Sequence, residues 1–372
     1  MSLLQYQLPD RETLENIGGY TEEEVDILSE AAAEFNVMSL AERKQLGRVF
    51  LRELWPDPYV FAEKTHWILD NRPTSPTFAQ LVRLVPNYAQ KEFINILRAQ
   101  QEAGLPLRVI ILKARQLGFS TFVQSWQYNQ CDLFANRSSL TISYDEDSTK
   151  EMFQKAVTIK RQQWMPQQAR RDSGNLIELA NGSKFHTATA GKLSAGRSFT
   201  IHHLHCSEVP MWPNATEVLT SVLQSVAYHK DTSIFLESTA KGAVGSFYEM
   251  WLQAEKGQST YVPFFAPWYW DPEYVYHFPT EQQAHEWARA HLKPEDIKYQ
   301  KAHKLTIGQM AWRFHKTMDG CEGHPLRFRQ EFPATAREAF LSSGSPRFSP
   351  DLVDALTHQC SEPSWCGSIG PA

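Results

Sequence analysis

Apolar residues recur every three or four positions through the first part of the chain, which is the spacing of helices that bury one face. Residues 21–37 (TEEEVDILSEAAAEFNV) begin with a threonine cap and three acids, which suit the N-terminal end of a helix. Residues 39–55 (SLAERKQLGRVFLRELW) repeat the pattern, with a serine cap and a glutamate three positions later. We therefore predict a helical extension over residues 1–75, ended by the breaker-rich PTSPTF at 73–78.

Between residues 76 and 262 the pattern changes to short apolar strands that alternate with helical stretches. Residues 108–114 (RVIILKA) are almost continuously apolar, which is typical of a strand covered on both faces of its sheet. Further strands are predicted in SSLTISY (138–144), FTIHHLHCSE (199–208), DTSIFLESTA (231–240) and a hairpin around Asn181-Gly182 in LIELANGSKFHTA (176–188). A helix is predicted from Asp147 to about Met165. Strands joined by helical crossovers predict an α/β fold with a largely parallel sheet flanked by helices.

After residue 262, aromatic residues and prolines become frequent, and charged stretches with helical spacing follow at 280–292, 293–305 and 306–318. We predict a C-terminal lid or linker over residues 263–345 and an irregular tail over 346–372. The chain is thus divided into a helical extension, an α/β core, a lid and a tail.

Composition limits the function classes only weakly. The net charge of -5 means that any nucleic-acid contact must come from a local patch. Lys160, Arg161, Arg170 and Arg171 are a candidate patch, although a solvated run of charges is the more ordinary interpretation. Five cysteines without a CxxC pair indicate a reducing compartment. No apolar run reaches the length of a membrane span, and the first residues do not resemble a secretory signal.

The strand at 108–114 runs into a turn that resembles a phosphate-binding loop. In the usual loop, GxxxxGK[ST], backbone amides hold phosphates, the lysine neutralises them and the hydroxyl binds magnesium. Aligned to this pattern, Gly118 is the second glycine and Ser120 the hydroxyl, but Phe119 occupies the lysine position. Lys113, at the position of the first glycine, or Arg115 could fold back over the turn instead. The alternative is an ordinary strand-to-helix turn with a solvated lysine and arginine.

Two further strands end in polar residues. The strand at 199–208 ends in Ser207-Glu208, where many ATPases have Asp-Glu, so Glu208 is a candidate general base and neutral Ser207 a weak magnesium contact. His203 and His205 share one face of this strand while His202 and Cys206 share the other, so the four do not converge on a zinc ion. The strand at 231–240 ends in Ser238, Thr239 and Ala240, at the edge where open α/β sheets bind ligands.

The order of these pieces resembles the ATPase domain of large terminases, the DNA-packaging motors of tailed bacteriophages. The resemblance covers about residues 75–345 and rests on ILKARQLGFST, LHCSEVPMW and ESTAKGAVGSFYEMW. It implies a P-loop NTPase fold of the ASCE, RecA-like type that uses ATP and Mg²⁺. The implied nucleotide-binding residues are Gln90, Lys113, Ala114, Arg115, Gln116, Leu117, Gly118, Phe119, Ser120 and Thr121.

The resemblance also assigns roles within this set. A basic residue at the start of the loop, Lys113 ahead of Arg115, would replace the missing lysine, and Gln90 would recognise adenine. Glu208 would be catalytic, and residues 238–240 would couple hydrolysis to movement. Arg197 would reach the γ-phosphate in a neighbouring subunit. Ser120 and Ser207 would face the metal.

The implied partners are double-stranded DNA, a portal protein and a small terminase subunit. The chain would be monomeric when isolated and would form a ring on the viral procapsid in the host cytoplasm. Large terminases also carry a nuclease domain, for which residues 346–372 are too few, so we expect an ATPase without nuclease activity. The alternatives are a standalone DNA translocase or helicase, and a degenerate docking protein, which Phe119 and Ser207 would favour.

Overall fold

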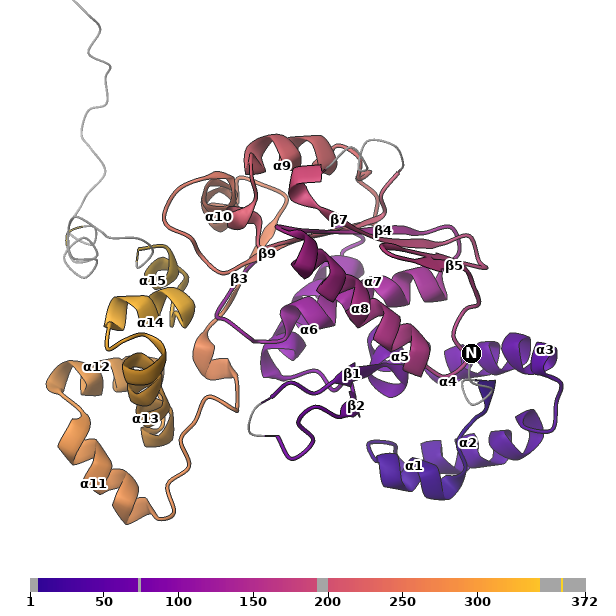
Figure 1. The fold of residues 1–372 in the computed structure, drawn as a ribbon, viewed down its shortest axis with the longest axis horizontal. Helices are drawn as coiled ribbons and strands as arrows, with labels where there is room; N and C mark the ends of the chain where they lie inside the picture. Colours follow the sequence, from indigo (N-terminus) through magenta and orange to yellow (C-terminus); the bar gives the residue numbers. More distant parts are fainter. Residues whose placement is uncertain (1–5, 73–74, 193–199, 342–355, 357–372) are drawn as a thin grey trace, which may run out of the picture.

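The computed structural model describes residues 6–72, 75–192, 200–341 and 356, and its centre is an eight-stranded sheet (Figure 1). The strand order is β10-β3-β9-β8-β4-β7-β6-β5. The strands are β3 (Leu107–Lys113), β4 (Ser138–Ser143), β5 (Ala169–Ser173), β6 (Leu176–Leu179), β7 (Lys184–Thr189), β8 (His203–Ser207), β9 (Ser233–Ser238) and β10 (Val262–Ala266). From β10 to β7 all pairings are parallel, while β6 and β5 form an antiparallel extension.

Helices cover both faces of this sheet. Figure 1 shows α6 (Tyr88–Glu102), α7 (Phe119–Leu133) and α8 (Glu146–Gln162) on one face, and α9 (Ala215–Leu223) and α10 (Ser246–Glu255) on the other. Every residue of β3 and β9 is buried, as expected of central strands in a sheet that is covered on both faces. The predicted α/β fold with a largely parallel, helix-flanked sheet is therefore confirmed.

Short helical turns complete the core: η3 (Ala190–Lys192), η5 (Val209–Met211) and η6 (Trp268–Trp270). The hairpin predicted around Asn181-Gly182 is present, with β6 and β7 as its two strands. Its turn uses Gly182 at a positive φ of 83°, a conformation that glycine adopts without steric cost. The predicted helix after β4 is α8, which begins at Glu146 behind an Asp145 cap.

The N-terminal region is helical as far as residue 65. Its elements are α1 (Arg11–Ile17), α2 (Glu22–Phe35), α3 (Leu40–Glu42), the π-helical turn η2 (Arg43–Gly47), α4 (Arg48–Leu54) and α5 (Pro58–Thr65). Beyond it, β1 (Trp67–Leu69) pairs with β2 (Leu81–Arg83), so the helical extension ends about ten residues earlier than predicted. Three apolar residues in a row do not distinguish helix from strand, and the partner strand lies beyond the turn.

A buried ion pair fastens the N-terminal helices to the core. Arg48 in α4 lies 2.7 Å from the carboxylate of Asp132 in α7 and also donates to the carbonyl of Met165, at 3.1 Å. The same carboxylate accepts hydrogen bonds from Gln163 and from the backbone of Gln167, both at 3.0 Å. Every oxygen of this buried group therefore has a partner, which keeps its charge from being left uncompensated.

The C-terminal region is a set of helices beside the β10 edge of the sheet (Figure 1). It consists of α11 (Glu281–His291), α12 (Pro294–His303), α13 (Ile307–His315), the π-helical turn η7 (Lys316–Gly320), α14 (Pro325–Glu331) and α15 (Ala336–Leu341). Stacked aromatic rings hold it to the core: the Trp268 ring lies 5.2 Å from that of Trp312, which lies 4.3 Å from that of Tyr274. The sheet continues past residue 262, because β10 extends to Ala266; its Pro263 is tolerated on an edge strand.

Three cysteines lie in the described part of the chain, namely Cys131, Cys206 and Cys321, and all are unpaired and buried. Burial raises the pKa of the Cys131 thiol to about 12, so this side chain behaves as a small apolar group. Among the described helices none combines the length and the apolar character needed to cross a membrane.

Candidate active site

Polar residues gather where the central strands end. Because β3, β9 and β8 run parallel and are adjacent, their carboxyl ends meet at one edge of the sheet. That edge brings together Lys113 from β3, Ser238 from β9 and Ser207 from β8, followed directly by Glu208. Residues far apart in the sequence thus form one site, as the sequence analysis expects.

The turn after β3 is held from the side by helix α6. The amide of Asn87 donates to the carbonyl of Leu117 at 3.1 Å, and that of Gln90 donates to the carbonyl of Gly118 at 3.0 Å. Gly118 has a φ of 75°, and a Cβ at this position would lie 2.8 Å from the Gln90 side chain. The positive φ therefore favours glycine, and any larger residue would also have to displace the amide of Gln90.

The first backbone amides of α7 have no partner within the helix, which is the general situation at a helix N-terminus. These amides, together with the positive end of the helix dipole, suit a phosphate group. Residues 114–121 are therefore a candidate anion-binding loop, although the amides of Ala114 and Arg115 already donate to the carbonyls of Ala266 and Glu331.

Phe119 occupies the position at which the usual phosphate loop has its lysine, and it is part of the apolar core. Its side chain is 1% exposed and belongs to the main apolar core, with ring centroids 5.7 Å from Phe93 and 5.6 Å from Phe264. A lysine at this position would place an ammonium group among aromatic rings, at a large desolvation cost. The position that carries the charge in other phosphate loops here belongs to the core.

The cation of the site is Lys113. It is 6% exposed, and its Nζ lies 3.5 Å from Oε1 of Glu208 and 3.4 Å from Oε1 of Glu237. Burial lowers the pKa of this lysine, but the two carboxylates outweigh burial and raise the pKa above its usual value. Lys113 is therefore charged and faces the acids of the site.

Arg115 lies in a different environment. Its guanidinium pairs with the carboxylate of Glu331 in α14, and its side chain is 58% exposed. The backbone of Arg115 is also held from the C-terminal region: its N–H donates to the carbonyl of Glu331 at 3.0 Å, and Tyr274 donates to its carbonyl at 2.8 Å. Of the two candidate cations, only Lys113 lies beside the acids, whereas Arg115 joins the loop to the C-terminal helices.

Glu208 has a strained backbone. Its φ of 53° and ψ of 45° are left-handed, which costs a non-glycine residue about 1–2 kcal/mol. Its N–H donates to the carbonyl of Glu237 at 2.7 Å, which holds this conformation. Strain of this kind persists where the surrounding structure fixes it and is frequent at functional sites.

The predicted coupling residues contact Glu208 directly. The hydroxyl of Ser238 donates to Oε2 of Glu208 at 3.0 Å, and that of Thr239 donates to the same oxygen at 3.5 Å. Ala240, the third of these residues, is buried. The candidate base and the candidate coupling segment are thus hydrogen-bonded neighbours.

Glu237 is a buried acid of the candidate site that the sequence analysis did not identify. It is 0% exposed, and its Oε1 accepts from the Ser120 hydroxyl at 2.9 Å while its Oε2 lies 2.6 Å from Nε2 of His205. Burial raises the pKa of Glu237, but Lys113, His205 and Ser120 outweigh burial and hold the pKa to about 2. The available signal was an acid inside the buried strand IFLES, where charged residues almost never occur without a partner.

The histidines in β8 and directly before it, His202, His203 and His205, each have separate partners. Nδ1 of His205 accepts from the amide of Gln124 at 2.9 Å, so its Nε2 carries the hydrogen that it donates to Glu237. Nδ1 of His203 lies 3.2 Å from the hydroxyl of Ser233, and Nδ1 of His202 accepts from the backbone of Ser138 at 3.1 Å. Within the described ranges no three or more His, Cys, Asp or Glu side chains form a group that could hold a metal ion.

Gln90 lies beside the loop, with its side chain already engaged. Its Oε1 accepts from the backbone of Asn87 at 3.0 Å, completing the cap of α6, while its amide nitrogen bonds to Gly118. To read a base, Gln90 would have to exchange one of these bonds. Arg197, the candidate finger, lies outside the described residues.

The structure does not support the predicted nucleic-acid patch of Lys160, Arg161, Arg170 and Arg171. Lys160 in α8 is 5% exposed and forms an ion pair with Asp172 in β5. Arg170 and Arg171 are exposed on β5, where Arg171 also donates to Ser173 at 3.0 Å. The four cations therefore do not form one exposed surface.

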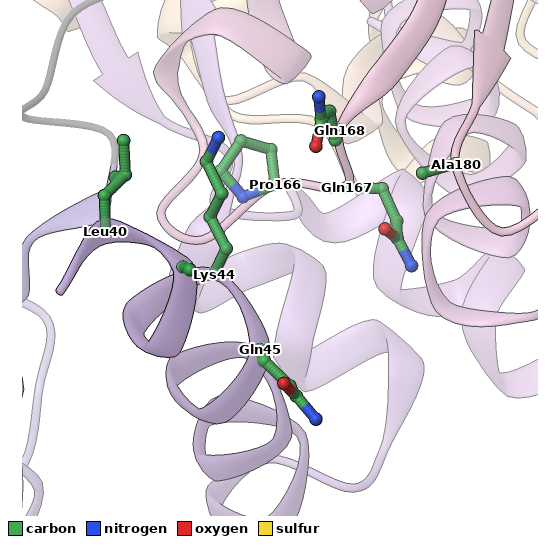
Figure 2. Close-up of a pocket in the computed structure, with 8 residues that line it drawn as sticks. Leu40, Lys44, Gln45, Pro166, Gln167, Gln168 and Ala180 are labelled. Atoms are coloured by element: carbon green, nitrogen blue, oxygen red, sulfur yellow. The ribbon is translucent and has the colours of Figure 1, made fainter.

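A cavity of about 580 Å³ lies elsewhere on the molecule (Figure 2). Lys44 and Gln45 of η2 line one side, and the segment from Pro166 to Gln168 lines the other. None of its lining residues belongs to the loop at 114–121. This cavity is therefore separate from the candidate active site.

The strand order places the fold within a defined class. β9 lies between β3, which leads into the loop, and β8, which leads to the candidate base Glu208. An additional strand between the phosphate-loop strand and the strand of the catalytic glutamate is the defining feature of the ASCE division of P-loop folds. The strand order therefore agrees with the ASCE-type P-loop fold that the resemblance implies.

No family model matches the chain, and no curated protein matches it. Its structural neighbours are phage large terminase ATPase domains. The ATPase domain of the Thermus phage P74-26 large terminase is 17% identical with a TM-score of 0.40, over 68% of this chain and 99% of that one. The large terminase of bacteriophage HK97 is 15% identical with a TM-score of 0.48, over 80% of this chain and 57% of that one.

A large terminase from a thermophilic bacteriophage, solved in complex with ATP-gamma-S, is 12% identical with a TM-score of 0.36. That match covers 56% of this chain and 50% of the other protein, so this chain spans about half of the longer terminases.

The depressed pKa of Glu237 predicts how stability depends on pH. Glu237→Gln should lower the free energy of unfolding near neutral pH, and its deficit relative to wild type should shrink as the pH falls from about 4.5 toward about 2. The unfolded carboxyl takes up its proton near the upper value and the folded one near the lower, so the stabilisation is present above this window and lost through it. Denaturant unfolding between about pH 3 and pH 7 measures the deficit. An unchanged deficit across that range would contradict an ionised, paired Glu237.

Proposed function

We propose that this chain is the ATP-hydrolysing motor domain of a DNA-packaging machine of the large-terminase type. The observation that carries the proposal is the position of Lys113, a buried cation that lies beside two carboxylates where the phosphate loop begins. A phosphate group bound by the loop would meet this ammonium and the first amides of α7 together. The sheet edge would then hold the triphosphate of ATP.

In this proposal Glu208 is the general base. Its carboxylate already accepts hydrogen bonds from Ser238 and Thr239, which orient it at the mouth of the site. When phosphate oxygens attract Lys113, the 3.5 Å contact between Lys113 and Glu208 would weaken, leaving the carboxylate free to take a proton from the attacking water. The salt bridge would therefore keep the base inactive until nucleotide arrives.

Magnesium fits the donor set of the site. Mg²⁺ prefers oxygen ligands and is usually bound by one or two protein groups together with substrate phosphates, so a cluster of three protein acids is not needed. Ser120, with its hydroxyl held by Glu237, would hold the ion, and the neutral Ser207 would contribute weakly. When bound, the ion would neutralise charge on the β- and γ-phosphates.

Movement would begin at the same residues. Ser238 and Thr239 contact the proposed base. Loss of the γ-phosphate would therefore change the contacts of the segment that follows β9. Arg115 joins the loop to Glu331, which gives the C-terminal lid, proposed over residues 263–345, a direct mechanical connection to the nucleotide. Gln90 would recognise adenine by exchanging its bond to Gly118.

The proposed partners are double-stranded DNA, a portal protein, a small terminase subunit and further copies of this chain in a ring. The chain would act in the host cytoplasm, transiently on the procapsid. A standalone DNA translocase or helicase is the second candidate, because the same nucleotide site could drive either machine. Strand separation on a partial duplex, in the absence of any portal, would favour this second candidate.

Replacing the two candidate cations separately tests the proposed role of Lys113. Lys113→Ala should reduce phosphate release from ATP by about 10²-fold or more, since it removes a charge that stabilises the transferring phosphoryl group. Arg115→Ala is the matched control and should retain most of the turnover, because this side chain faces Glu331. Both are measured with and without double-stranded DNA. Near-normal turnover in Lys113→Ala, or no turnover in the wild type under any of these conditions, would contradict the proposal.

Glu208→Gln should lower ATP turnover by about 10²-fold or more while ATP binding stays nearly intact. The amide keeps the size of the carboxylate but cannot accept a proton. Calorimetric titration with ATP separates the two effects. An equal loss of binding and turnover would mean a structural role.

The same variant tests whether Arg197 acts on the nucleotide site of a neighbouring subunit. Mixed with Arg197→Ala, which has a complete site but no finger, Glu208→Gln should recover activity that neither variant has alone. An arginine supplied in trans is worth about 10³–10⁵ in rate. No recovery under conditions where wild type assembles and hydrolyses ATP would exclude Arg197.

A further inference from the structure

We propose that Glu237 is the positioning carboxylate of the metal site, taking over from the neighbouring strand the role that the neutral Ser207 cannot perform. This inference rests on the proposed ATPase function and deepens it. Glu237 would act through the Ser120 hydroxyl and the Lys113 ammonium, both of which it contacts directly.

The register of the sheet places Glu237 one strand closer to the phosphate loop than Ser207. Ser207 in β8 and Glu237 in β9 are direct Cα partners, and Glu237 is also the partner of Ile111 in β3. Neighbouring strands lie about 4.8 Å apart, so moving a carboxylate from position 207 to position 237 brings it one strand closer to the phosphate loop. The longer glutamate side chain then reaches the loop from the middle of the sheet.

One carboxylate oxygen of Glu237 contacts both the Ser120 hydroxyl and the Lys113 ammonium. Its Oε1 accepts from Ser120, the hydroxyl that the phosphate-loop pattern assigns to magnesium, and lies 3.4 Å from the Lys113 ammonium. One oxygen thus fixes the direction of both a metal-facing hydroxyl and a phosphate-facing cation. Groups that orient metal ligands in this way typically change metal affinity or activity by about 10–100-fold when removed.

A chain of hydrogen bonds behind Glu237 fixes its side chain. Oε2 of Glu237 accepts from His205, which in turn accepts from the Gln124 amide. The same amide donates to the hydroxyl of Thr141 at 3.0 Å, which donates to Gln127 at 2.7 Å. All members of this chain are buried, so each group is held in place by a satisfied partner. The carboxylate is therefore presented to the loop in one orientation.

Manganese binding tests the inference independently of turnover. Free Mn²⁺ is followed by electron paramagnetic resonance during titration of protein saturated with a non-hydrolysable ATP analogue. Glu237→Gln should weaken Mn²⁺ binding by about 10–100-fold, because the amide keeps the shape and the bond from His205 but removes the charge. Glu178→Gln, a carboxylate on β6 outside the site, is the matched control and should bind Mn²⁺ as wild type does.

Exchanging the two positions gives a sharper result. Ser207→Asp combined with Glu237→Gln returns the carboxylate to β8 and should restore most of the lost Mn²⁺ affinity. Ser207→Asp alone places two carboxylates at paired positions, where like charges oppose each other, and should give no gain over wild type. If Glu237→Gln does not fold, Glu237→Asp keeps the charge but withdraws it from Ser120, and it should show a weaker form of the same loss.

The outcomes separate this inference from the proposed function. Failure of wild-type protein to bind the analogue at all would contradict the ATPase proposal itself. Normal analogue binding with equal Mn²⁺ affinity in wild type and Glu237→Gln would overturn the role of Glu237 alone. A lower melting temperature without nucleotide, with unchanged Mn²⁺ affinity, would show a purely structural ion pair and would also overturn the inference.

Discussion

A lysine whose ammonium group is buried at the edge of a sheet must have acids close to it, because an unpaired buried charge would lose its proton or destabilise the fold. Lys113 satisfies this condition through Glu208 and Glu237, which come from two different strands. Each carboxylate in turn depends on Lys113 as the partner that compensates its charge. The remaining features of the site follow from this arrangement: the strained backbone of Glu208, the bond from Ser120 and the chain through His205 all keep the three charges together.

The same arrangement connects the site to the parts of the chain that could move. Glu208 is hydrogen-bonded to the end of β9, and the loop that begins at Lys113 is bonded through Arg115 to α14. A ligand that draws Lys113 away from its acids would therefore alter contacts on both sides of the site at once. Phe119, which is packed in the aromatic core, supplies no charge at the usual lysine position, and Arg115 faces Glu331. Lys113 is therefore the cation of the loop that faces Glu208 and Glu237.

The helices, the parallel sheet and the meeting of Lys113, Ser120, Glu208 and Ser238 at one edge were predictable, because period and strand direction are local properties of the sequence. Glu237 was not predicted: its partners come from β3, β8 and α7, and only the three-dimensional register places them around one carboxylate. Lys160 was misjudged for a related reason, since helix periodicity does not reveal that β5 supplies Asp172. The strand β1 escaped prediction because its pairing partner lies across a turn.

A crystal structure of the chain with ATP-gamma-S and Mg²⁺ tests most directly whether the charged group around Lys113 is a nucleotide site. We predict phosphates in the loop at 114–121, with the Lys113 ammonium moved from its carboxylate partners onto phosphate oxygens and Arg115 still paired with Glu331. Nucleotide bound elsewhere, for example in the cavity beside Lys44, or bound in the loop with Lys113 unmoved between Glu208 and Glu237, would contradict the account.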